Sequence, residues 1–329
     1  MAFSNTYDQT NTGSAVSNRE QLLDVLTILA PEETPLLSLA KKSKATSTYV
    51  EWTVDSLAAP SSAGISEGAD VDAFADKFAA RARLGNYVQK FRRPFMVSDL
   101  QQAVDSVGPA KVAQAESKAL RELKRDIEKT ICSENDRNAE DGAGQAYTLR
   151  GFGKWVSTAP GSDVPSQYRT SGDAIHESGD GTFDEDALND IITEIYRKNG
   201  MSNMLTLLAD TALRREISKF TRSEGSTTAT SYQVQESATS KKITFTVSMY
   251  ESDQGIISII NMNPDCAPDT TNKDTGYIVN PSYVGVAELI PVGSTLLENQ
   301  GGGERGFVDA TCTLLVNHPQ AHGKITTLS

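Results

Sequence analysis

The chain has 329 residues, a length that favours about two domains and can bury a large core without disulfide staples. Its formal net charge of -12 opposes nonspecific binding to nucleic acid, which requires clustered lysine and arginine. The three cysteines, Cys132, Cys266 and Cys312, are scattered without paired spacing. This pattern argues against a disulfide framework or a zinc site and is typical of a protein made in a reducing cytoplasm.

The sequence carries no recognisable targeting segment. The stretch Met1–Tyr7 lacks a basic region followed by an apolar run, and no apolar run of about eighteen residues occurs anywhere. We therefore expect neither a signal peptide nor a membrane-spanning helix.

The first part of the chain predicts a polar arm followed by short helices. Residues 1–16 contain few apolar side chains, so we expect an arm that is mobile or ordered by a partner. Ser17 and Glu20 have the spacing of a capping box, and the leucine-rich helix that follows should end at Pro31. A second helical turn should begin at Thr34–Pro35, before the chain enters its first strand.

Two alternating segments predict a long two-stranded arm. Thr48–Val54 alternates apolar and polar side chains, as half-buried strands do, and so does Arg81–Phe91 from Tyr87 onward. We expect the two segments to pair. Between them, about Ser56 to Phe78, lies a tip with almost nothing that could form a core. Because an isolated two-stranded ribbon is marginal in water, we expect its partner surface to lie on another molecule.

The charges of this arm are segregated. The tip is acidic, with a single lysine among its carboxylates, whereas the returning strand is basic. One interpretation is a charged contact with a partner, and the other is simple solvation of an exposed loop. The acidic residues of the tip are Glu67, Asp70, Asp72 and Asp76.

A long helix should follow the turn at Gly108–Pro109 and run to about Cys132. One apolar stripe at spacings of three and four should hold it to the body. The stripe consists of Val112, Leu120, Leu123, Ile127 and Ile131. We expect the charged residues to lie on the other faces, in solvent or against a neighbour, with Lys124 and Glu128 spaced as an ion pair. These charged residues are Glu116, Lys118, Arg121, Glu122, Lys124, Arg125, Glu128 and Lys129.

The second half of the chain predicts helices followed by strands. Residues 134–182 are rich in Gly, Ser, Asp and Asn, interrupted by Gly151–Val156, and should form a loop-rich boundary between lobes. A helix should follow the Thr182–Glu185 capping box and end at Gly200. Then come a buried strand and a helix, and residues 222–242 should be a loop. The strand is expected at Met204–Leu208 and the helix at Asp210–Phe220.

Alternation dominates after residue 242, so the class is α+β with an antiparallel or mixed sheet. The predicted strands are Ile243–Val247, Gly255–Ile260, Thr275–Val279, Tyr283–Leu289 and Val308–Val316.

No motif carries convincing chemistry. Gly301–Gly306 satisfies the letters of a dinucleotide fingerprint, but a strand follows where a phosphate-binding helix is needed, so a flexible turn is favoured. His318 and His322 are separated by Pro319 and lack a third ligand, so we favour surface histidines over a metal pair. His176 stands alone in a loop. We expect no cofactor and no metal, and an enzyme is the minority hypothesis.

Several segments, taken in order, resemble the major capsid proteins of tailed phages with the Hong Kong 97-type fold. Each segment is weak alone, but their order and spacing cover nearly the whole chain. The segments are Ala30–Ser38, Glu51–Leu57, Asn86–Gln89 through Val97–Ser98, Glu194–Tyr196 with Gly200, Met249–Gly255 and Leu314–His322.

The resemblance implies a shell-forming subunit with an N-terminal arm, an extended E-loop hairpin, a P-domain with a long spine helix, and an A-domain with a mixed or antiparallel sheet. The implied divisions are residues 1–45 for the N-terminal arm, 46–93 for the E-loop, 94–200 for the P-domain with its spine helix at 109–133, 201–289 for the A-domain, and 290–329 for strands returning to the P-domain. Residues 134–182 then read as a local elaboration.

The resemblance also implies partners. Copies of the chain should form hexamers and pentamers of an icosahedral shell around double-stranded DNA, which lies near by nonspecific proximity only. A separate scaffolding protein and a portal are expected, with a decoration protein as a further candidate and no membrane. We expect the protein in the virion, and in the host cytoplasm during assembly. The rival hypothesis is a soluble enzyme or carbohydrate-binding module with a site in the glycine-rich loops, which would purify as a compact monomer without particles.

In a shell, the acidic tip of one subunit could contact basic charge on the spine helix of the next. Single exposed ion pairs contribute at most about 1 kcal/mol, but one pair recurs at every subunit contact. The predicted contact residues are Glu67, Asp70, Asp72 and Asp76 on the tip and Arg121, Lys124 and Arg125 on the helix.

Overall fold

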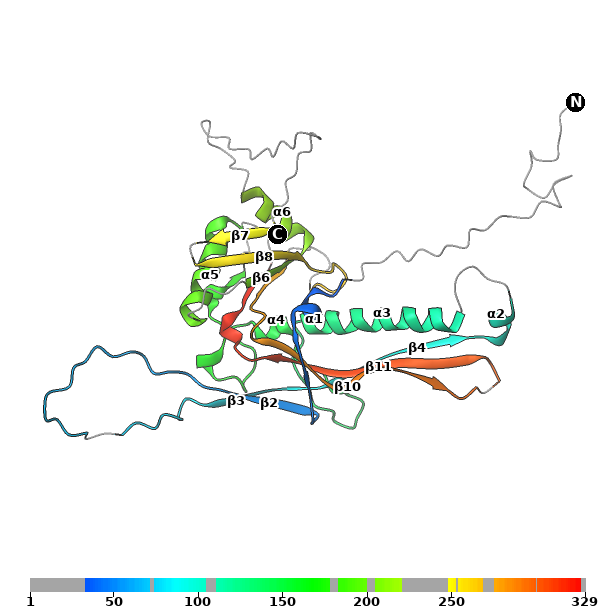
Figure 1. The fold of residues 1–329 in the computed structure, drawn as a ribbon, viewed down its shortest axis with the longest axis horizontal. Coiled ribbons are helices and arrows are strands. Elements are labelled where there is room, and N and C mark those ends of the chain that lie inside the picture. The colour runs from blue at the N-terminus through cyan, green and yellow to red at the C-terminus, as the bar shows by residue number, and fades with distance from the viewer. Residues whose placement is uncertain are drawn as a thin grey trace, which may run out of the picture.

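The computed structural model describes most of the chain in nine ranges. They are residues 33–71, 74–104, 111–177, 183–199, 205–220, 248–252, 254–268, 275–299 and 301–326. The predicted leucine-rich helix before Pro31 and the predicted strand Ile243–Val247 lie outside these ranges. The described part contains three bodies: a protruding arm, an elongated sheet covered by one long helix, and a second sheet with its own helices (Figure 1).

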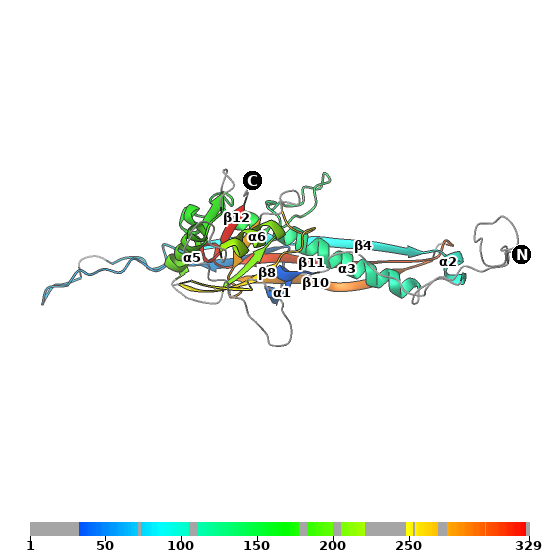
Figure 2. The same ribbon diagram turned by 90° about the horizontal axis from the view of Figure 1, so that it is seen from above.

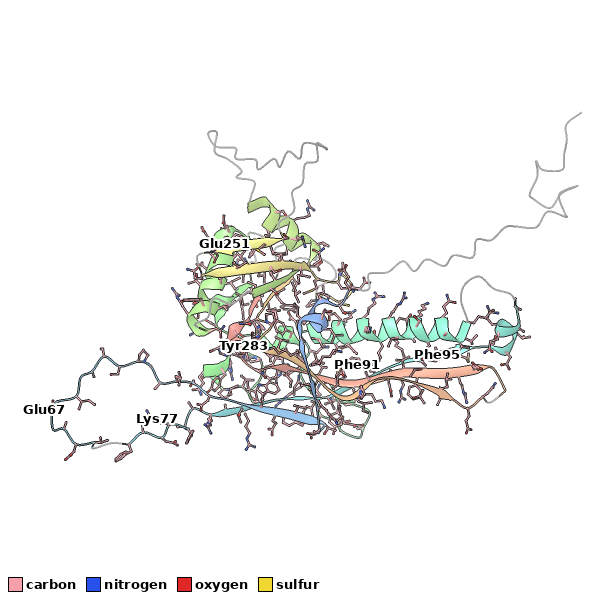
Figure 3. All side chains as sticks on the ribbon, viewed as in Figure 1. Glu67, Lys77, Phe91, Phe95, Glu251 and Tyr283 are labelled. Atoms are coloured by element: carbon pink, nitrogen blue, oxygen red, sulfur yellow. The ribbon has the colours of Figure 1, made fainter. Side chains whose placement is uncertain are left out.

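The arm is the predicted ribbon. β2 (Tyr49–Val54) pairs antiparallel with β3 (Ala82–Tyr87), with Tyr49 opposite Tyr87 and Val54 opposite Ala82. The pair forms a two-stranded sheet that is joined to neither of the larger sheets by strand pairing. The chain between β2 and β3 forms no helix or strand in its described residues 55–71 and 74–81. This tip extends far from the body, with Glu67 near its outer end (Figure 3).

The elongated sheet has four strands in the order β1-β10-β11-β4. β1 runs parallel to β10, and the other pairs are antiparallel. The strands are β1 (Lys41–Lys44), β4 (Gln89–Val97), β10 (Val284–Leu297) and β11 (Glu304–Val316). The turn between β10 and β11 contains Gly301 and Gly303, both with positive φ, so the glycine-rich motif is a hairpin turn as predicted.

The arm's basic strand was predicted to end near Phe91, and this boundary was wrong. The chain leaves the arm at Val88 and continues as β4 through Pro94, which lies opposite Phe307 in β11. Proline is tolerated here because β4 is an edge strand, where a missing N–H costs no ladder hydrogen bond on the solvent side.

α3 (Lys111–Cys132) lies along β4 and β11 and is the predicted long helix over its described residues (Figures 1 and 2). Leu123, Ile127 and Ile131 are buried, as the apolar stripe required. They share one core with Phe91 and Phe95 of β4, on the face of the sheet that α3 covers. Four shorter helical segments accompany α3, namely α1 (Pro35–Leu39), α2 (Asp99–Ala103), α4 (Phe152–Trp155) and η1 (Ser166–Tyr168).

The second sheet has six strands in the order β5-β12-β9-β6-β8-β7, with both parallel and antiparallel pairs. Helices α5 (Glu185–Asn199) and α6 (Thr211–Phe220) pack with it in a second core. This arrangement confirms the α+β class with a mixed sheet. The strands are β5 (Ile175–Glu177), β6 (Leu205–Ala209), β7 (Met249–Ser252), β8 (Gly255–Asn261), β9 (Gly276–Val279) and β12 (Gly323–Thr326). Two further 3-10 turns, η2 (Gly172–Ala174) and η3 (Pro319–Ala321), lie before β5 and β12.

Glu128 was expected on the solvent side of α3, but it is fully buried. Its carboxylate accepts hydrogen bonds from the backbone N–H groups of Leu36, at 2.8 Å, and Leu37, at 2.9 Å. Burial raises the pKa of Glu128 despite these hydrogen bonds, which favour the charged form. The expectation failed because α1 packs onto α3 and its first N–H groups need acceptors.

The expectation of surface histidines was wrong for His322, which is fully buried. Its Nδ1 accepts a hydrogen bond from the backbone N–H of Asn280 at 3.1 Å, and its ring lies edge-on to Phe152. Burial lowers the pKa of His322 to about 3, so the ring is neutral in the folded protein. The residue is buried because the chain passes from η3 into β12 at this point, inside the second sheet.

The three cysteines are buried free thiols. Burial raises the pKa of Cys266 to about 11 and that of Cys312 to about 12, so neither is a reactive thiolate at neutral pH. Across the described ranges, no helix is long and apolar enough to cross a membrane.

Candidate assembly surfaces and the base of the arm

The tip of the arm exposes large apolar side chains. Leu57 is 99% exposed, Ile65 88% and Phe74 90%. Phe78 is exposed as well, and the guanidinium of Arg81 lies over its ring at 4.1 Å. The tip was correctly predicted to contribute nothing to the core of its own subunit. Its apolar residues nevertheless form an uncovered surface, and the sequence analysis overlooked them because it weighed only the charges.

The predicted acidic residues of the tip are exposed where the structure describes them. Glu67 and Asp70 are exposed, and Asp72 lies outside the described residues. Asp76 accepts a hydrogen bond from the backbone N–H of Phe78 at 2.9 Å, so it also has a local structural role.

The predicted basic residues lie on α3, away from the tip of the same chain (Figure 1). Arg121 and Lys124 are exposed. Arg125 forms an ion pair with Asp265 of its own chain, so its charge is already partly neutralised within the subunit. The structure therefore does not bring the tip and the basic residues together within one subunit.

A second apolar surface lies at the opposite end of the molecule. Met96, at the end of β4, is 72% exposed, and Leu100, in α2, is 80% exposed. Leu296 and Leu297, at the end of β10, are exposed as well. Met96 and Leu297 both lie opposite Arg305 of β11, so they share one face of the sheet, and Leu296 lies on the other face. Single exposed apolar residues are ordinary, but exposed neighbours of this size are typical of a contact surface.

The base of the arm is held by a group of residues that the sequence analysis treated as a loop-rich elaboration. We call Arg137, Arg150, Trp155, Asp163 and Tyr168 the arm socket. Each contacts the arm or another member of the group. The signal in the sequence was Gly151–Val156, which places Phe and Trp in a region otherwise rich in Gly, Ser, Asp and Asn.

Arg150 forms the buried centre of the arm socket. Its side chain is 2% exposed and pairs with Asp136 at 2.7 Å and Asp163 at 2.8 Å, with the guanidinium 4.7 Å from the centre of the Trp155 ring. Burial opposes ionisation of Asp163, but the hydrogen bonds and charge of Arg150 outweigh it and lower the pKa of Asp163. A buried arginine with two carboxylate partners is a fixed element, because losing one partner would leave a charge uncompensated.

The arm contacts this group along β3. Buried Asn86 accepts a hydrogen bond from the backbone N–H of Arg150 at 2.8 Å and donates to the carbonyl of Leu314 at 2.9 Å. Trp52 of β2 lies 5.5 Å from Trp155, ring centre to ring centre. Further out, the hydroxyl of Tyr168 donates to the carbonyl of Ala80.

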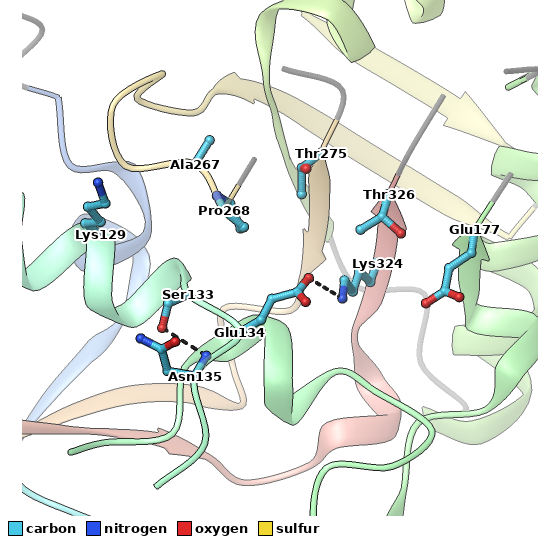
Figure 4. Close-up of a pocket in the computed structure, with 10 residues that line it drawn as sticks. All are labelled: Lys129, Ser133, Glu134, Asn135, Glu177, Ala267, Pro268, Thr275, Lys324 and Thr326. Atoms are coloured by element: carbon cyan, nitrogen blue, oxygen red, sulfur yellow. Dashed lines mark hydrogen bonds and ion pairs between the residues drawn. The ribbon is translucent and has the colours of Figure 1, made fainter. Parts of the chain in front are cut away.

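One polar cavity of 670 Å³ lies between the end of α3 and the second sheet (Figure 4). Buried Lys324 forms an ion pair with Glu134 at 2.5 Å, and Lys129 and Glu177 lie elsewhere on the wall. The cavity pairs its buried cation with Glu134. Among the described residues that line the cavity, none is a nucleophile with an adjacent base. Within the part of the chain that the structure describes, no group of three or more His, Cys, Asp or Glu side chains could hold a metal ion.

The protruding hairpin, the long helix on an elongated sheet and the separate mixed sheet define the Hong Kong 97-type fold of viral shell proteins. The capsid protein of the cyanophage P-SCSP1u matches with a TM-score of 0.63 at 13% identity, covering 99% of this chain and 98% of that one. The capsid of a native GTA particle matches with a TM-score of 0.62 at 10% identity, covering 97% and 98%. An encapsulin of Synechococcus elongatus matches with a TM-score of 0.54 at 11% identity, covering 94% and 91%.

The chain belongs to the SU10 major capsid protein family, whose model matches residues 4–329. It is therefore a structural major capsid protein of a tailed phage, a subunit of the icosahedral shell of the virion, and not an enzyme. No curated protein matches the chain.

Proposed function

We propose that subunits of this protein join head to tail, with the apolar tip of the arm of one subunit lying on the body of the next. The observation that carries the proposal is the exposure of Leu57, Ile65 and Phe74 on a segment without a core of its own. Burying one side chain of this size contributes roughly 1.5 to 3 kcal/mol, which is enough to offset part of the cost of association. A head-to-tail contact of this kind closes into rings, as hexamers and pentamers of a shell require.

The acidic residues of the tip add direction to this contact. We propose that Glu67 and Asp70 face basic residues of the neighbouring α3, with Lys124 as the preferred partner. Arg121 and Arg125 lie on the same helix, but the pair between Arg125 and Asp265 makes Arg125 a weaker candidate. The acidic charge contributes orientation more than affinity, because exposed ion pairs are screened by salt.

The remaining proposed partners are proteins that a phage shell needs for its assembly and for the packaging of DNA. We propose a separate scaffolding protein and a portal, with a decoration protein as a candidate for the outer surface. The enclosed DNA would lie near the shell without specific contacts, in keeping with the net charge of -12. We also keep the division into N-terminal arm (1–45), E-loop (46–93), P-domain (94–200), A-domain (201–289) and returning strands (290–329) as a proposal.

The direct test is deletion of Ser62–Val71 from the tip. These residues contribute no side chain to the buried cores, so we expect a folded subunit with wild-type circular dichroism and unfolding behaviour. Assembly should fail, giving capsomers or smaller species in place of closed particles by negative-stain microscopy. Closed particles of wild-type yield from the deletion variant would refute the proposed role of the tip.

A double-mutant cycle tests the charged part of the contact separately. Glu67→Lys should weaken assembly at low salt, and Lys124→Glu should partly restore it, with a coupling of at most about 1 kcal/mol. Lys124 is preferred to Arg125 for this cycle because reversing Arg125 would also break its pair with Asp265. If Glu67→Lys assembles like the wild type across a salt series, the acidic residues only solvate the loop.

A further inference from the structure

The direction of the arm must be fixed at its base. β2 and β3 form their own two-stranded sheet, and a ribbon of this kind has little stability or rigidity alone. Six residues in each strand span roughly 20 Å at about 3.3 Å per residue, so a tilt of about 10° at the base moves the far end by about 3.5 Å. Contacts at the base therefore decide where the tip arrives.

Arg137 is the member of the arm socket whose guanidinium contacts both strands of the arm. Its guanidinium donates to the hydroxyl of Tyr49, in β2, and to the carbonyl of Gly85, in β3. It lies 5.1 Å from the centre of the Tyr49 ring and 5.9 Å from that of Tyr87. On its other side it pairs with Asp163 at 3.3 Å, and Asp163 is held in turn by buried Arg150.

The arm is shaped to receive this arginine. Tyr49 crosses directly over Gly85, where a Cβ atom would lie 2.5 Å from the tyrosine hydroxyl. A side chain at position 85 would therefore displace the hydroxyl that Arg137 contacts. The planar guanidinium suits this place because it can donate several hydrogen bonds in one plane while stacking on aromatic rings.

The two arginines of the arm socket have different tasks. The side chain of Arg150 binds Asp136 and Asp163, and its link to the arm runs through its backbone to Asn86. The side chain of Arg137 touches the arm itself, and does so on both strands. The hydrogen bonds of Asn86 thus attach β3 alone to the body, whereas the side chain of Arg137 contacts both strands.

We propose that Arg137 is a positioning residue that sets the direction of the arm, and thereby the geometry with which one subunit reaches the next. The second half of this inference rests on the proposed function, since it requires that the arm contacts a neighbour. The first half, that Arg137 sets the direction of the arm, concerns the isolated subunit and does not depend on the proposed function.

The first half can be measured as a distance distribution between two spin labels. The native cysteines are buried, so labels will attach to cysteines introduced at exposed positions, Thr53→Cys on β2 and Lys118→Cys on α3. Dilution with unlabelled protein removes distances between subunits. We expect one narrow distribution in otherwise wild-type protein and a distribution about two-fold wider, or shifted, in Arg137→Ala.

Arg169→Ala is the matched control. Arg169 lies in the same region, but its guanidinium donates to the carbonyls of Val164, at 2.8 Å, and Gly161, at 3.4 Å. It should leave the distribution narrow. Arg137→Lys keeps the charge without the planar fork and should be intermediate. An unchanged distribution in Arg137→Ala, or equal widening in the Arg169→Ala control, would overturn the assignment.

If Arg137→Ala does not fold, Tyr49→Phe provides the same test, because it removes the hydroxyl acceptor and keeps the ring. It should widen the distribution less than two-fold, and an unchanged distribution would overturn the proposal.

The second half of the proposal, that Arg137 sets the geometry between subunits, is tested by the diameters of assembled particles. Arg137→Ala should broaden the distribution of particle diameters. If Arg137 only stabilised the fold, its loss would instead give fewer particles, all of the wild-type diameter. A uniform wild-type diameter despite a redirected arm would refute it, while failure of the tip deletion test would refute the proposed function and leave the distance result intact.

Discussion

The long helix α3 and the arm are both elongated and highly charged, yet they use their residues in opposite ways. On α3 the apolar stripe is buried at Leu123, Ile127 and Ile131 and partly buried at Val112 and Leu120. Several charges are matched within the chain, Arg93 with Asp126 and Arg125 with Asp265. On the tip of the arm, Leu57 and Phe74 are almost completely exposed. The body therefore carries the stability of the subunit, and we propose that the exposed groups of the arm find their partners on another subunit.

The sharpest way to break this comparison is to truncate one apolar residue in each region. Leu123→Ala should lower the free energy of unfolding by about 2 to 5 kcal/mol, because it leaves a cavity under α3. Phe74→Ala should change it by less than about 0.5 kcal/mol, since the ring is exposed, but should reduce particle yield. Denaturant unfolding of dissociated subunits and particle counting measure the two effects. Equal losses of stability would contradict the separation.

Buried His322 makes the stability of the body sensitive to acid. Its pKa is about 3 in the folded protein against 6.5 when unfolded, so the unfolded state binds the proton more tightly. Stability is therefore present above pH 6.5 and should be lost as the pH falls toward 3, by about 1.4 kcal/mol per pH unit and so about 2 kcal/mol at pH 5. Unfolding of wild type and His322→Asn at pH 7 and pH 5 isolates this contribution. An identical loss in both proteins would mean that other groups cause it.

The buried carboxylate of Glu128 should stabilise the body by satisfying α1. Glu128→Ala leaves the N–H groups of Leu36 and Leu37 without their acceptor, which should cost about 2 kcal/mol in thermal or denaturant unfolding. Its pKa is raised by burial, so the folded state favours the protonated form. Relative to Glu128→Gln, wild-type stability should therefore decline as the pH rises from 4.5 through that raised pKa. The opposite slope would show that the hydrogen bonds outweigh burial.

The smallest effect should come from a charge pair on the outside of the body. Arg93 contacts Asp126 through two hydrogen bonds, at 2.5 and 2.6 Å, and both side chains are partly exposed. Arg93→Ala should cost about 1 kcal/mol or less in the free energy of unfolding, and less still at high salt. A much larger loss would mean that the link between β4 and α3 depends on this pair more than on Phe91 and Phe95.

The sequence was informative where local periodicity decides the structure. The stripe through Leu123 and Ile127 predicts α3, where one face is buried, and the alternation in Thr48–Val54 predicts β2 of the arm, where half-buried and exposed side chains alternate. It failed where a distant segment supplies the environment. Glu128 is buried by α1, about ninety residues away, and His322 is buried against Asn280 and Phe152. No spacing rule within either helix or turn can indicate such contacts.

The candidate contact surfaces were predictable only in part. The acidic character of the tip follows from composition, whereas the importance of Leu57 and Phe74 required their exposure to be seen. The arm socket was missed because its residues lie on loops or, like Trp155 in α4 and Tyr168 in η1, on helical segments too short to show a period. Arg137, for example, contacts residues of β2 and β3 that lie more than fifty residues earlier in the sequence.

Amide hydrogen exchange tests the central claim most directly, namely that the tip completes its contacts on another subunit. The exchange of residues 55–71 and 74–81 can be compared between dissociated subunits and assembled particles, with α3 as the internal reference. We predict fast exchange of the tip in the subunit, strong protection of the tip in the particle, and slow exchange of α3 in both. Equally fast exchange of the tip in subunit and particle would contradict the account.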